Sequence, residues 1–530
     1  MKNKGIAAAL VALLILALAP MARSDSARPM IVRVRPDSAA DAAFLMSHYD
    51  ETHNHGGGEI ELLLWPGDRS ELDALGFDYR VVVNDLFARD MLTSTAAKQK
   101  LSLPGPDRDD YRRLVDYNTE MADLAKKNPQ LVKLFEMKQP TLEGRPVFGV
   151  EIASQVKNDD GRPIFYIDAV HHAREWPSSE YTMLFVHHLV EEYGKDPKVT
   201  SLLKKARVIA VPIVNVDGFN YTREAVLSYN QPLRDATENM AAGNGFEGYW
   251  RKNRRSLTGV TVPAAQVNPD AFGVDPNRNY SYLWGDSNGG SSGLQLDQTY
   301  RGEAPFSEPE TQNVRDIILG RSVTGVLTNH TFQASVLRAG GGKAPDDVLL
   351  SSIGQKVADI LGYSNQATVG YPTTGTTDDW AYAAMGALGY TIEHGEIAFH
   401  PGYADEVGKF WPEHMDAFEV LFDMAANPKY HSVLKGRVSG GPAQLTLAKT
   451  FVTELSPGNP TGEDGVEEKI ELKLTTKPDG TFEWHVGPSD RPYEKKPESY
   501  TLTIKSSSGT KTMKVHIDRG QVLNLGTIKL

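Results

Sequence analysis

The chain has 530 residues, a formal net charge of -12 and no cysteine. Such a length exceeds what one hydrophobic core usually holds and predicts about three domains. The negative charge argues against nucleic acid as a partner. The lack of cysteine excludes disulfide bonds, lipidated cysteine and thiolate metal ligands, so a zinc ion would have to be bound by histidine and carboxylate.

Residues 1–24 have the pattern of a secretory signal peptide. Lys2 and Lys4 precede the apolar run Ile6–Ala19, which is short for a membrane span, and Pro20 and small residues follow it. A membrane anchor is the alternative that this pattern leaves open. We expect a secreted or periplasmic protein without stable membrane association once the signal is removed.

Residues 25–92 are predicted to form a small α/β domain. The expected strands are Met30–Val34, Ile60–Trp65 and Tyr79–Val83, and the expected helices are Ala39–His48 and Glu71–Leu75. His48, His53 and His55 lie near a glycine run, and we interpret them as part of a solvated loop rather than a metal site. Residues 93–106 contain Ser, Thr, Ala, Lys, Gly and Pro without an apolar period, which predicts a linker accessible to proteases.

Helices and strands alternate over residues 107–427. The expected strands are Leu131–Glu136, Val147–Ile152, Ile164–Val170, Arg207–Val214, Val323–Leu327 and Gly389–Ile392, and the expected helices are Tyr111–Lys127, Ser178–Tyr193, Asp346–Leu361 and Lys409–Met424. This alternation predicts an α/β fold whose mixed, mostly parallel sheet is flanked by helices. Residues 216–300 are expected to form long loops, which in a compact domain are usually functional.

Residues 430–530 change to a period of two. Apolar and polar residues alternate over 470–474, 482–486, 502–504 and 513–517, with turns such as 478–480 between them. This pattern predicts a C-terminal antiparallel β-sandwich. It contains no evident catalytic set of residues.

Polar side chains stand where two of the predicted strands end. Ile164–Val170 is followed by His171, His172 and Glu175, and a second apolar strand ends at His330. Open α/β sheets bind ligands beyond the ends of such strands. Zinc accepts both imidazole and carboxylate, and a catalytic zinc commonly takes three protein ligands and leaves one position for water. Because His-x-x-Glu also arises by chance, the rest of the chain has to support a metal site.

Further groups of residues follow in a distinctive order. They are His172-Ala-Arg-Glu175-Trp176, Asn215-Val-Asp217-Gly218, Tyr249-Trp-Arg251-Lys252, Asp275-Pro-Asn277-Arg278-Asn279, Tyr300-Arg-Gly302, the stretch 305–311, and Tyr371, Asp379-Trp380 and Glu393. In this order they resemble the motifs of the zinc carboxypeptidases of the carboxypeptidase A type, over about residues 107–427. The resemblance implies the carboxypeptidase fold and an enzyme that hydrolyses the C-terminal peptide bond of peptides and proteins.

The resemblance implies a metal centre with one zinc ion. His172, Glu175 and His330 would bind the ion. His171 is an alternative to His172, although the order of the family motif selects His172. Asp275 would orient His172 through its second ring nitrogen, as metal-bound histidines require.

Catalytic roles are implied for Glu393 and Arg251. Zinc lowers the pKa of water and polarises the scissile carbonyl. Glu393 would act as general base, accepting a proton from that water and passing it to the leaving amine. Arg251 would face the developing oxyanion, where a fixed positive charge favours the transition state.

Substrate-binding roles are implied for four residues. Asn277, Arg278 and Tyr371 would bind the terminal carboxylate of the substrate, because a guanidinium binds a carboxylate through two parallel hydrogen bonds. Asp378 falls where family members that prefer basic terminal residues carry an acid, and broad specificity stays an equal alternative. Phe332 departs from the tyrosine of the pancreatic members, so a hydrogen bond from that position is lost.

The outer domains and the final function leave choices open. Residues 25–92 look similar to the activation segments of the family, which implies an activating protease that cuts the linker; a permanent accessory domain is the alternative. The C-terminal sandwich resembles, by pattern, transthyretin-like modules. A zinc amidase or carboxypeptidase acting on peptidoglycan stem peptides, and a non-catalytic binding protein on the same scaffold, are the two rival functions.

Overall fold

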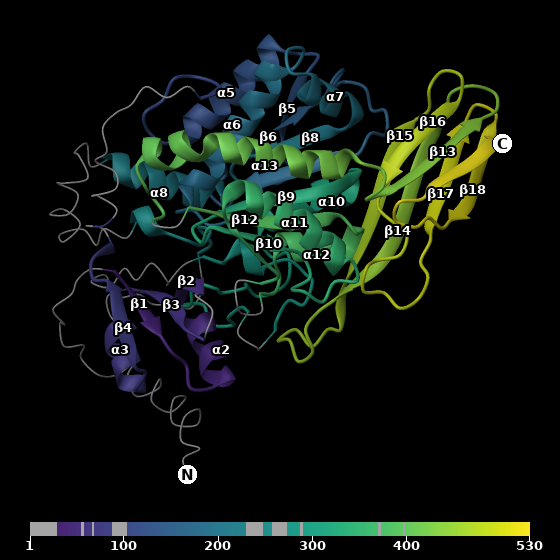
Figure 1. Cartoon of the computed structure of the whole chain (residues 1–530). Helices are drawn as coiled ribbons and strands as arrows, with labels where there is room; N and C mark the ends of the chain where they lie inside the picture. The colour runs from purple at the N-terminus through teal and green to yellow at the C-terminus, as the bar shows by residue number, and fades with distance from the viewer. Residues whose placement is uncertain are drawn as a thin grey trace.

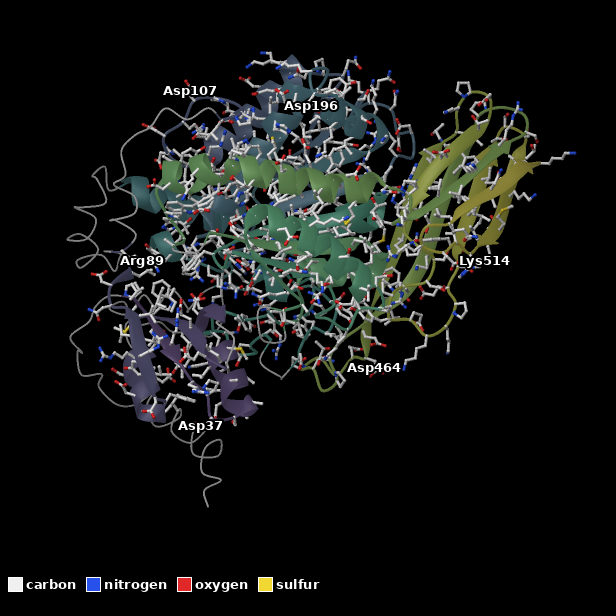
Figure 2. The ribbon with its side chains drawn as sticks, in the orientation of Figure 1. Asp37, Arg89, Asp107, Asp196, Asp464 and Lys514 are labelled. Carbon is white, nitrogen blue, oxygen red and sulfur yellow. The ribbon has the colours of Figure 1, made fainter. Side chains whose placement is uncertain are left out.

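The computed structural model describes residues 29–54, 58–65, 68–86, 89, 103–228, 247–256, 273–286, 290–368, 373–395 and 398–530. The predicted signal peptide and most of the predicted linker lie outside these residues. In Figure 1 the N-terminal elements (purple) lie against one side of a central helix-and-sheet body, and the C-terminal strands (yellow) stand against another side of it. Charged side chains such as Asp37, Asp196 and Lys514 project from the surface of these three parts (Figure 2).

The N-terminal α/β unit, residues 29–86, is a four-stranded antiparallel sheet with two helices. Its elements are β1 (Met30–Val34), α2 (Ala39–His48), β2 (Asp50–Asn54), β3 (Ile60–Leu64), α3 (Asp68–Leu75) and β4 (Tyr79–Val83). The strand order is β2-β3-β1-β4. Ser38 caps α2 by accepting a hydrogen bond from the backbone N–H of Asp41 at 3.1 Å, as an N-cap serine should.

The loop interpretation of the N-terminal histidines is wrong for two of them. His53 lies in β2, where its backbone pairs with Glu61 of β3, so sheet pairing decides its conformation. His48 ends α2, and its ring lies 3.3 Å from the Glu71 carboxylate and 3.1 Å from that of Asp297. His55 lies outside the described residues.

The central sheet has eight strands in the order β11-β10-β12-β9-β7-β8-β6-β5. The strands are β5 (Val132–Glu136), β6 (Phe148–Ile152), β7 (Ile164–Ala169), β8 (Arg207–Val211), β9 (Val323–Thr331), β10 (Ser335–Arg338), β11 (Ser364–Gln366) and β12 (Leu388–His394). The pairs β7–β8, β7–β9, β9–β12 and β10–β11 are parallel, and β5–β6, β6–β8 and β10–β12 are antiparallel. The predicted mixed, mostly parallel sheet is therefore confirmed.

Helices cover the central sheet. They are α5 (Leu114–Lys127), α6 (Trp176–Glu192), α7 (Pro197–Lys205), α8 (Val216–Ser228), α10 (Pro309–Gly320), α11 (Asp347–Leu361), α12 (Thr377–Met385) and α13 (Lys409–Ala426). α6 and α13 pack on β7 and β9, α11 packs on β10, and α12 packs on β12. None of the helices in the described part of the chain is both long and apolar enough to cross a membrane.

The prediction of long loops over 216–300 is wrong for the first part of that range, which forms α8. The Asn215 side chain accepts a hydrogen bond from the backbone N–H of Gly218 at 3.0 Å and so stabilises the first turn. A Cβ added at Gly218 would lie 2.8 Å from the Cβ of Ala173, so only glycine fits there. The Asn-x-Asp-Gly motif thus starts a helix that packs close to the segment after β7.

The C-terminal strands form two facing sheets, with the orders β16-β13-β19 and β15-β14-β17-β18. They are β13 (Ser432–Val438), β14 (Gln444–Glu454), β15 (Gly465–Thr475), β16 (Thr481–Val486), β17 (Tyr500–Ser506), β18 (Gly509–Val515) and β19 (Val522–Ile528). The predicted sandwich is confirmed, except that β13 and β19 pair in parallel. Its buried residues join those of the central sheet in one continuous apolar core.

Candidate active site

Three strands of the central sheet bring the predicted metal and acid residues to one edge. The chain leaves β7 at Ala169, and His172 and Glu175 follow before α6 begins. His330 lies near the end of β9, and Glu393 of β12 is its direct neighbour in the parallel β9–β12 pair. Because the carboxyl ends of neighbouring parallel strands meet at one edge, these side chains converge.

His172, Glu175 and His330 form a buried cluster whose ligand atoms all lie within 4.8 Å of one another. The Nδ1 atoms of the two histidines are 3.2 Å apart. Glu175 Oε1 lies 2.6 Å from His172 Nδ1, and Glu175 Oε2 lies 2.9 Å from His330 Nδ1. Two imidazoles and a carboxylate that face one point are a donor set that zinc accepts.

Other side chains hold the second nitrogens of both rings. Asp275 Oδ1 lies 3.2 Å from His172 Nε2, and the Thr328 hydroxyl lies 3.4 Å from His330 Nε2. The Nη2 group of Arg251 donates to Asp275 Oδ2 at 2.8 Å. Burial alone would raise the pKa of Asp275, but the charges of Arg251 and His172 outweigh burial and hold the pKa well below its usual range. Asp275 is therefore an ionised anchor that orients His172.

His171, the alternative ligand, turns away from the cluster. Its Nε2 lies 2.9 Å from the Tyr280 hydroxyl and 2.8 Å from the Thr377 hydroxyl. Burial, together with the nearby His330, lowers the pKa of His171 well below its usual value. His171 is thus a neutral, hydrogen-bonded core residue.

A cavity of about 400 Å³ opens over the cluster. Its lining includes both catalytic candidates, Glu393 and Arg251. Burial, followed by the charge of Glu175, raises the pKa of Glu393 to about 8. A carboxylate raised in this way is a stronger base than an exposed one, which suits proton transfer.

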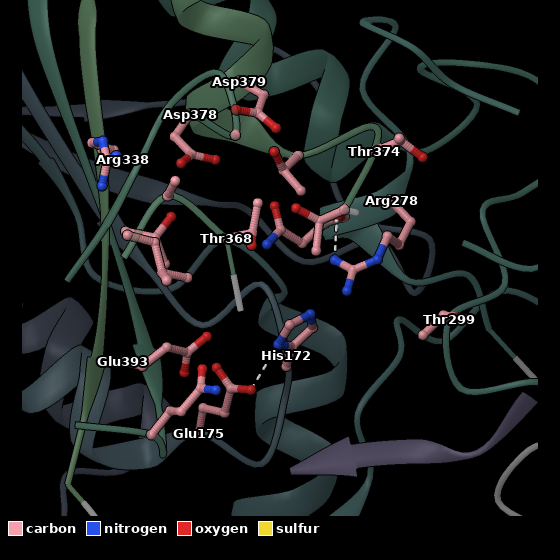
Figure 3. A pocket seen from close by; sticks show the side chains of 18 of the residues that line it. His172, Glu175, Arg278, Thr299, Arg338, Thr368, Thr374, Asp378, Asp379 and Glu393 are labelled. Atoms are coloured by element: carbon pink, nitrogen blue, oxygen red, sulfur yellow. Dashed lines mark hydrogen bonds and ion pairs between the residues drawn. The ribbon is translucent and has the colours of Figure 1, made fainter. Parts of the chain in front are cut away.

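Three substrate-binding candidates, Asn277, Arg278 and Asp378, line the same cavity. Figure 3 shows His172, Glu175 and Glu393 on one side and Asp378, Asp379 and Arg278 across from them. Arg278 is only 4% exposed, and its Nη1 group donates to the Asn277 backbone oxygen at 2.8 Å. Tyr371 lies outside the described residues, so its role stays a prediction.

Asp378 lies in the first turn of α12 and is 6% exposed. Among the described residues, no side chain pairs with its carboxylate. Asp379, by contrast, accepts a hydrogen bond from the backbone N–H of Gly340 at 2.6 Å. Burial, followed by the charge of Asp378, raises the pKa of Asp379 to about 7. The first turn of α12 therefore places two neighbouring carboxyl groups in the cavity wall.

Arg174 and its partner Asp50 are among the charged residues of the cavity that the sequence analysis missed. Arg174 makes a bidentate ion pair with Asp50 of β2, with Nη2 2.7 Å from Oδ1, and both side chains are buried. Its guanidinium also lies over the Phe399 ring, 4.1 Å from the centroid. The position of Arg174 inside the His-x-x-Glu motif was a signal, but its partner comes from a distant part of the chain.

An apolar contact lies next to this ion pair. Ile31, Leu63 and Trp65 of the N-terminal unit form one buried cluster with aromatic residues of the central body: Tyr249, Phe332 and Phe399. Asp50 and Phe399 both line the cavity. The N-terminal unit therefore covers part of the entrance to the candidate site.

A buried His-Glu-His set lies next to a carboxylate with a raised pKa, at the carboxyl ends of the strands of an α/β sheet. This arrangement defines a metal-dependent hydrolase. A model of the Peptidase_M14 family, described as zinc carboxypeptidase, matches residues 117–416. This match spans more than half of the chain, and the chain belongs to that family. It is a zinc metallocarboxypeptidase that uses one metal ion, which confirms the resemblance seen in the motifs.

Relatives agree with this assignment. Human carboxypeptidase B is 26% identical over 328 residues, which cover 59% of this chain and 69% of the relative. Carboxypeptidase B of Helicoverpa zea is 28% identical over 375 residues, which cover 64% and 78%. Among solved structures, carboxypeptidase A of Helicoverpa armigera has a TM-score of 0.57 at 22% identity and covers 75% of this chain and 97% of its own, which shows a shared fold.

Proposed function

We propose that the chain is an exported zinc carboxypeptidase that removes single residues from the free C-termini of peptides and proteins, with Glu393 as its general base. One observation carries this proposal. His172 and Glu175, which form a cluster with His330, line one cavity together with the carboxylate of Glu393 and the guanidinium of Arg278.

The proposed mechanism assigns one task to each group. His172, Glu175 and His330 would hold zinc, which when bound lowers the pKa of water and polarises a carbonyl. Glu393 takes the proton of the attacking water and delivers it to the leaving amine. Arg251, held by Asp275 at 2.8 Å, supplies a fixed positive charge for the oxyanion.

Recognition of the chain end is assigned to three side chains. Arg278, Asn277 and Tyr371 bind the terminal carboxylate, which restricts cleavage to the last residue. The buried Asp378 carboxylate supports a preference for terminal Lys or Arg, because a substrate cation would offset the cost of burying that charge. The alternative is broad specificity, with Asp378 solvated when small side chains bind.

The proposed domain organisation follows from the sequence pattern. Residues 1–24 are a signal peptide, 25–92 a prosegment, 93–106 a linker, 107–427 the catalytic domain and 430–530 a transthyretin-like accessory domain. The prosegment would restrict access to the site through the Asp50–Arg174 ion pair and the apolar contact beside it. An activating protease that cuts the linker would then release it.

Mass spectrometry of peptide mixtures tests this function. The full chain, before and after limited trypsin treatment, is incubated with hippuryl-arginine, hippuryl-phenylalanine and a C-terminally amidated peptide, with and without chelator. We expect chelator-sensitive release of single residues from free C-termini only, with more activity after trypsin. Cleavage of the amidated peptide at the same rate would refute the proposed recognition. Release from a muropeptide in place of the hippuryl substrates would favour the stem-peptide enzyme.

A further inference from the structure

The C-terminal sandwich contacts the back of the cavity wall that lies across from the metal cluster. In Figure 1, α12 of the central body lies beside β14 of the sandwich. Two segments of the central body meet the sandwich there. One is α12, whose first turn contains Asp378 and Asp379, and the other is residues 279–286, which follow Arg278 directly. Tyr282 and Leu283 of the second segment line the cavity.

One buried carboxylate of the sandwich binds both segments. Glu468 of β15 is 5% exposed. Its oxygens accept hydrogen bonds from Trp380 Nε1 at 3.1 and 3.2 Å and from the Ser281 hydroxyl at 3.0 Å. The Thr453 hydroxyl of β14 donates to the same carboxylate at 2.9 Å. Trp380 is two residues from Asp378, and Ser281 is three residues from Arg278, so Glu468 links both substrate-binding segments.

Backbone contacts extend this link along the loop. The backbone N–H of Leu283 donates to the backbone oxygen of Glu454 at 2.9 Å, and the backbone N–H of Ser456 donates to the backbone oxygen of Trp284 at 3.0 Å. At Gly285, which has a φ of +87°, an added Cβ would lie 2.4 Å from the Cβ of Asn459. The loop is therefore hydrogen-bonded to the sandwich through its backbone and packs directly against it.

An aromatic contact braces the cavity wall itself. The ring of Tyr493 stacks on that of Tyr282, with centroids 5.2 Å apart and planes at 10°. It also meets the Tyr382 ring of α12 edge-on at 5.7 Å. Tyr493 lies behind Gly340 as well, where an added Cβ would be 2.5 Å from its hydroxyl oxygen. One sandwich residue thus supports three parts of the wall.

We infer that the C-terminal sandwich is part of the substrate-recognition device, and that Glu468 and Tyr493 are positioning residues that set the shape of the pocket for the terminal residue. This inference rests on the proposed function. Neither residue lines the cavity. Each acts through segments that do, and small displacements of such segments are costly because reacting groups need near-exact placement.

Pairs of variants test the inference. Glu468→Ala and Tyr493→Ala remove the contacts, whereas Glu468→Gln keeps an acceptor oxygen and Tyr493→Phe keeps the stacked ring. We expect each alanine variant to retain its zinc, to raise KM more than it lowers kcat, and to change the ratio of kcat/KM between hippuryl-arginine and hippuryl-phenylalanine about tenfold. The conservative variants should restore most of the wild-type ratio.

A control variant separates positioning from loss of the interface in general. Ser322→Ala removes another hydrogen bond between the sandwich and the central body, from Trp484 Nε1 at 3.1 Å. It should leave the substrate ratio unchanged. A ratio that stays within about twofold of wild type in both alanine variants, or that shifts as much in Ser322→Ala, overturns the inference.

Hydrogen exchange gives a readout that does not depend on activity. Peptides covering residues 279–286 and 376–385 should exchange faster in Glu468→Ala and Tyr493→Ala than in wild type, and unchanged exchange overturns the inference. If Glu468→Ala does not fold, the Tyr493 pair decides by itself. If the wild-type chain cleaves no free C-terminus, the proposed function fails, and hydrogen exchange alone decides the positioning role.

Discussion

Two groups of histidine and carboxylate side chains in the described residues bring their ligand atoms within 4.8 Å. The buried cluster consists of His172, Glu175 and His330, and the surface cluster consists of Asp490, His516 and Asp518. The first lies at the carboxyl ends of strands β7 and β9 of the central sheet, and the second lies on the C-terminal sandwich. The two sets have similar chemistry in very different surroundings.

The difference lies in what the second ring nitrogens do. In the buried cluster, Asp275 and the Thr328 hydroxyl lie next to the Nε2 atoms, and both Nδ1 atoms are directed at Glu175. In the surface cluster, His516 Nδ1 lies 2.8 Å from the Glu498 backbone oxygen, and the side chain is 43% exposed. Proximity alone therefore does not make a metal centre, because neighbouring side chains must also orient the imidazole rings and exclude water.

The sharpest comparison removes one histidine from each cluster. His330→Ala should reduce bound zinc from one ion per chain to almost none and abolish hydrolysis, because two ligands hold zinc poorly. His516→Ala should change neither quantity. Elemental analysis after dialysis measures the metal, and hippuryl substrates measure the activity. Zinc that stays bound in His330→Ala, or is lost in His516→Ala, would contradict the assignment.

A second variant separates metal binding from proton transfer within the buried site. Glu393→Gln should keep the zinc ion but lower kcat by about 10² to 10⁴, the usual contribution of a positioned general base. The amide has nearly the same size as the carboxylate but accepts no proton at neutral pH. Activity near the wild-type level would show that another group is the base.

The third comparison tests the orienting carboxylate. Asp275→Asn should weaken zinc affinity about 10- to 100-fold, because an amide orients the His172 ring less strongly. Asp490→Asn, in the surface cluster, is the matched control and should have no effect. Competition with a chelator of known affinity measures both. Equal affinities in the two variants would mean that Asp275 merely stabilises its loop.

The smallest expected effect concerns the buried carboxyl group of Glu310. Burial, followed by the charge of Glu308, raises the pKa of Glu310 from 4.5 to about 8. The folded state therefore keeps Glu310 protonated between these values while the unfolded chain ionises, so the stability that Glu310 contributes is lost as pH rises towards 8. A shift of this size corresponds to on the order of 5 kcal/mol.

Glu310→Gln isolates that dependence, because glutamine has no charge to bury. Thermal unfolding from pH 5 to 9 should show the variant gaining stability relative to wild type as pH rises, with the gain levelling off above about pH 8. A difference that does not vary with pH would show that Glu310 is already ionised, or protonated, throughout the range.

Several of the expectations depended on local sequence and were met by the structure. A strand followed at once by His-x-x-Glu, a second strand ending in histidine and a third ending in glutamate all have short-range signals. The parallel β9–β12 register then places His330 beside Glu393. His172, Glu175 and His330 converge because each lies at or just after the carboxyl end of a strand of the same sheet.

The expectations that failed depended on distant partners. His53 adopts a strand because β3 is available to pair with it. α8 replaces an expected loop because Asn215 caps it and Gly218 allows close packing on Ala173. Neither the glycine run nor the polar composition of these segments predicts such contacts. The contacts therefore decided the conformation against the local sequence preference.

By itself, the sequence determined the α/β class of the central body, the His-Glu-His donor set and the zinc carboxypeptidase family, since these depend on residue type, order and period. Tertiary structure alone decided that Arg174 pairs with Asp50 and that Glu468 reaches Trp380. Arg174 and Asp50 are 124 positions apart in the sequence, and Trp380 and Glu468 are 88 positions apart. Because such pairings arise only when separate elements pack together, no local pattern in the chain encodes them.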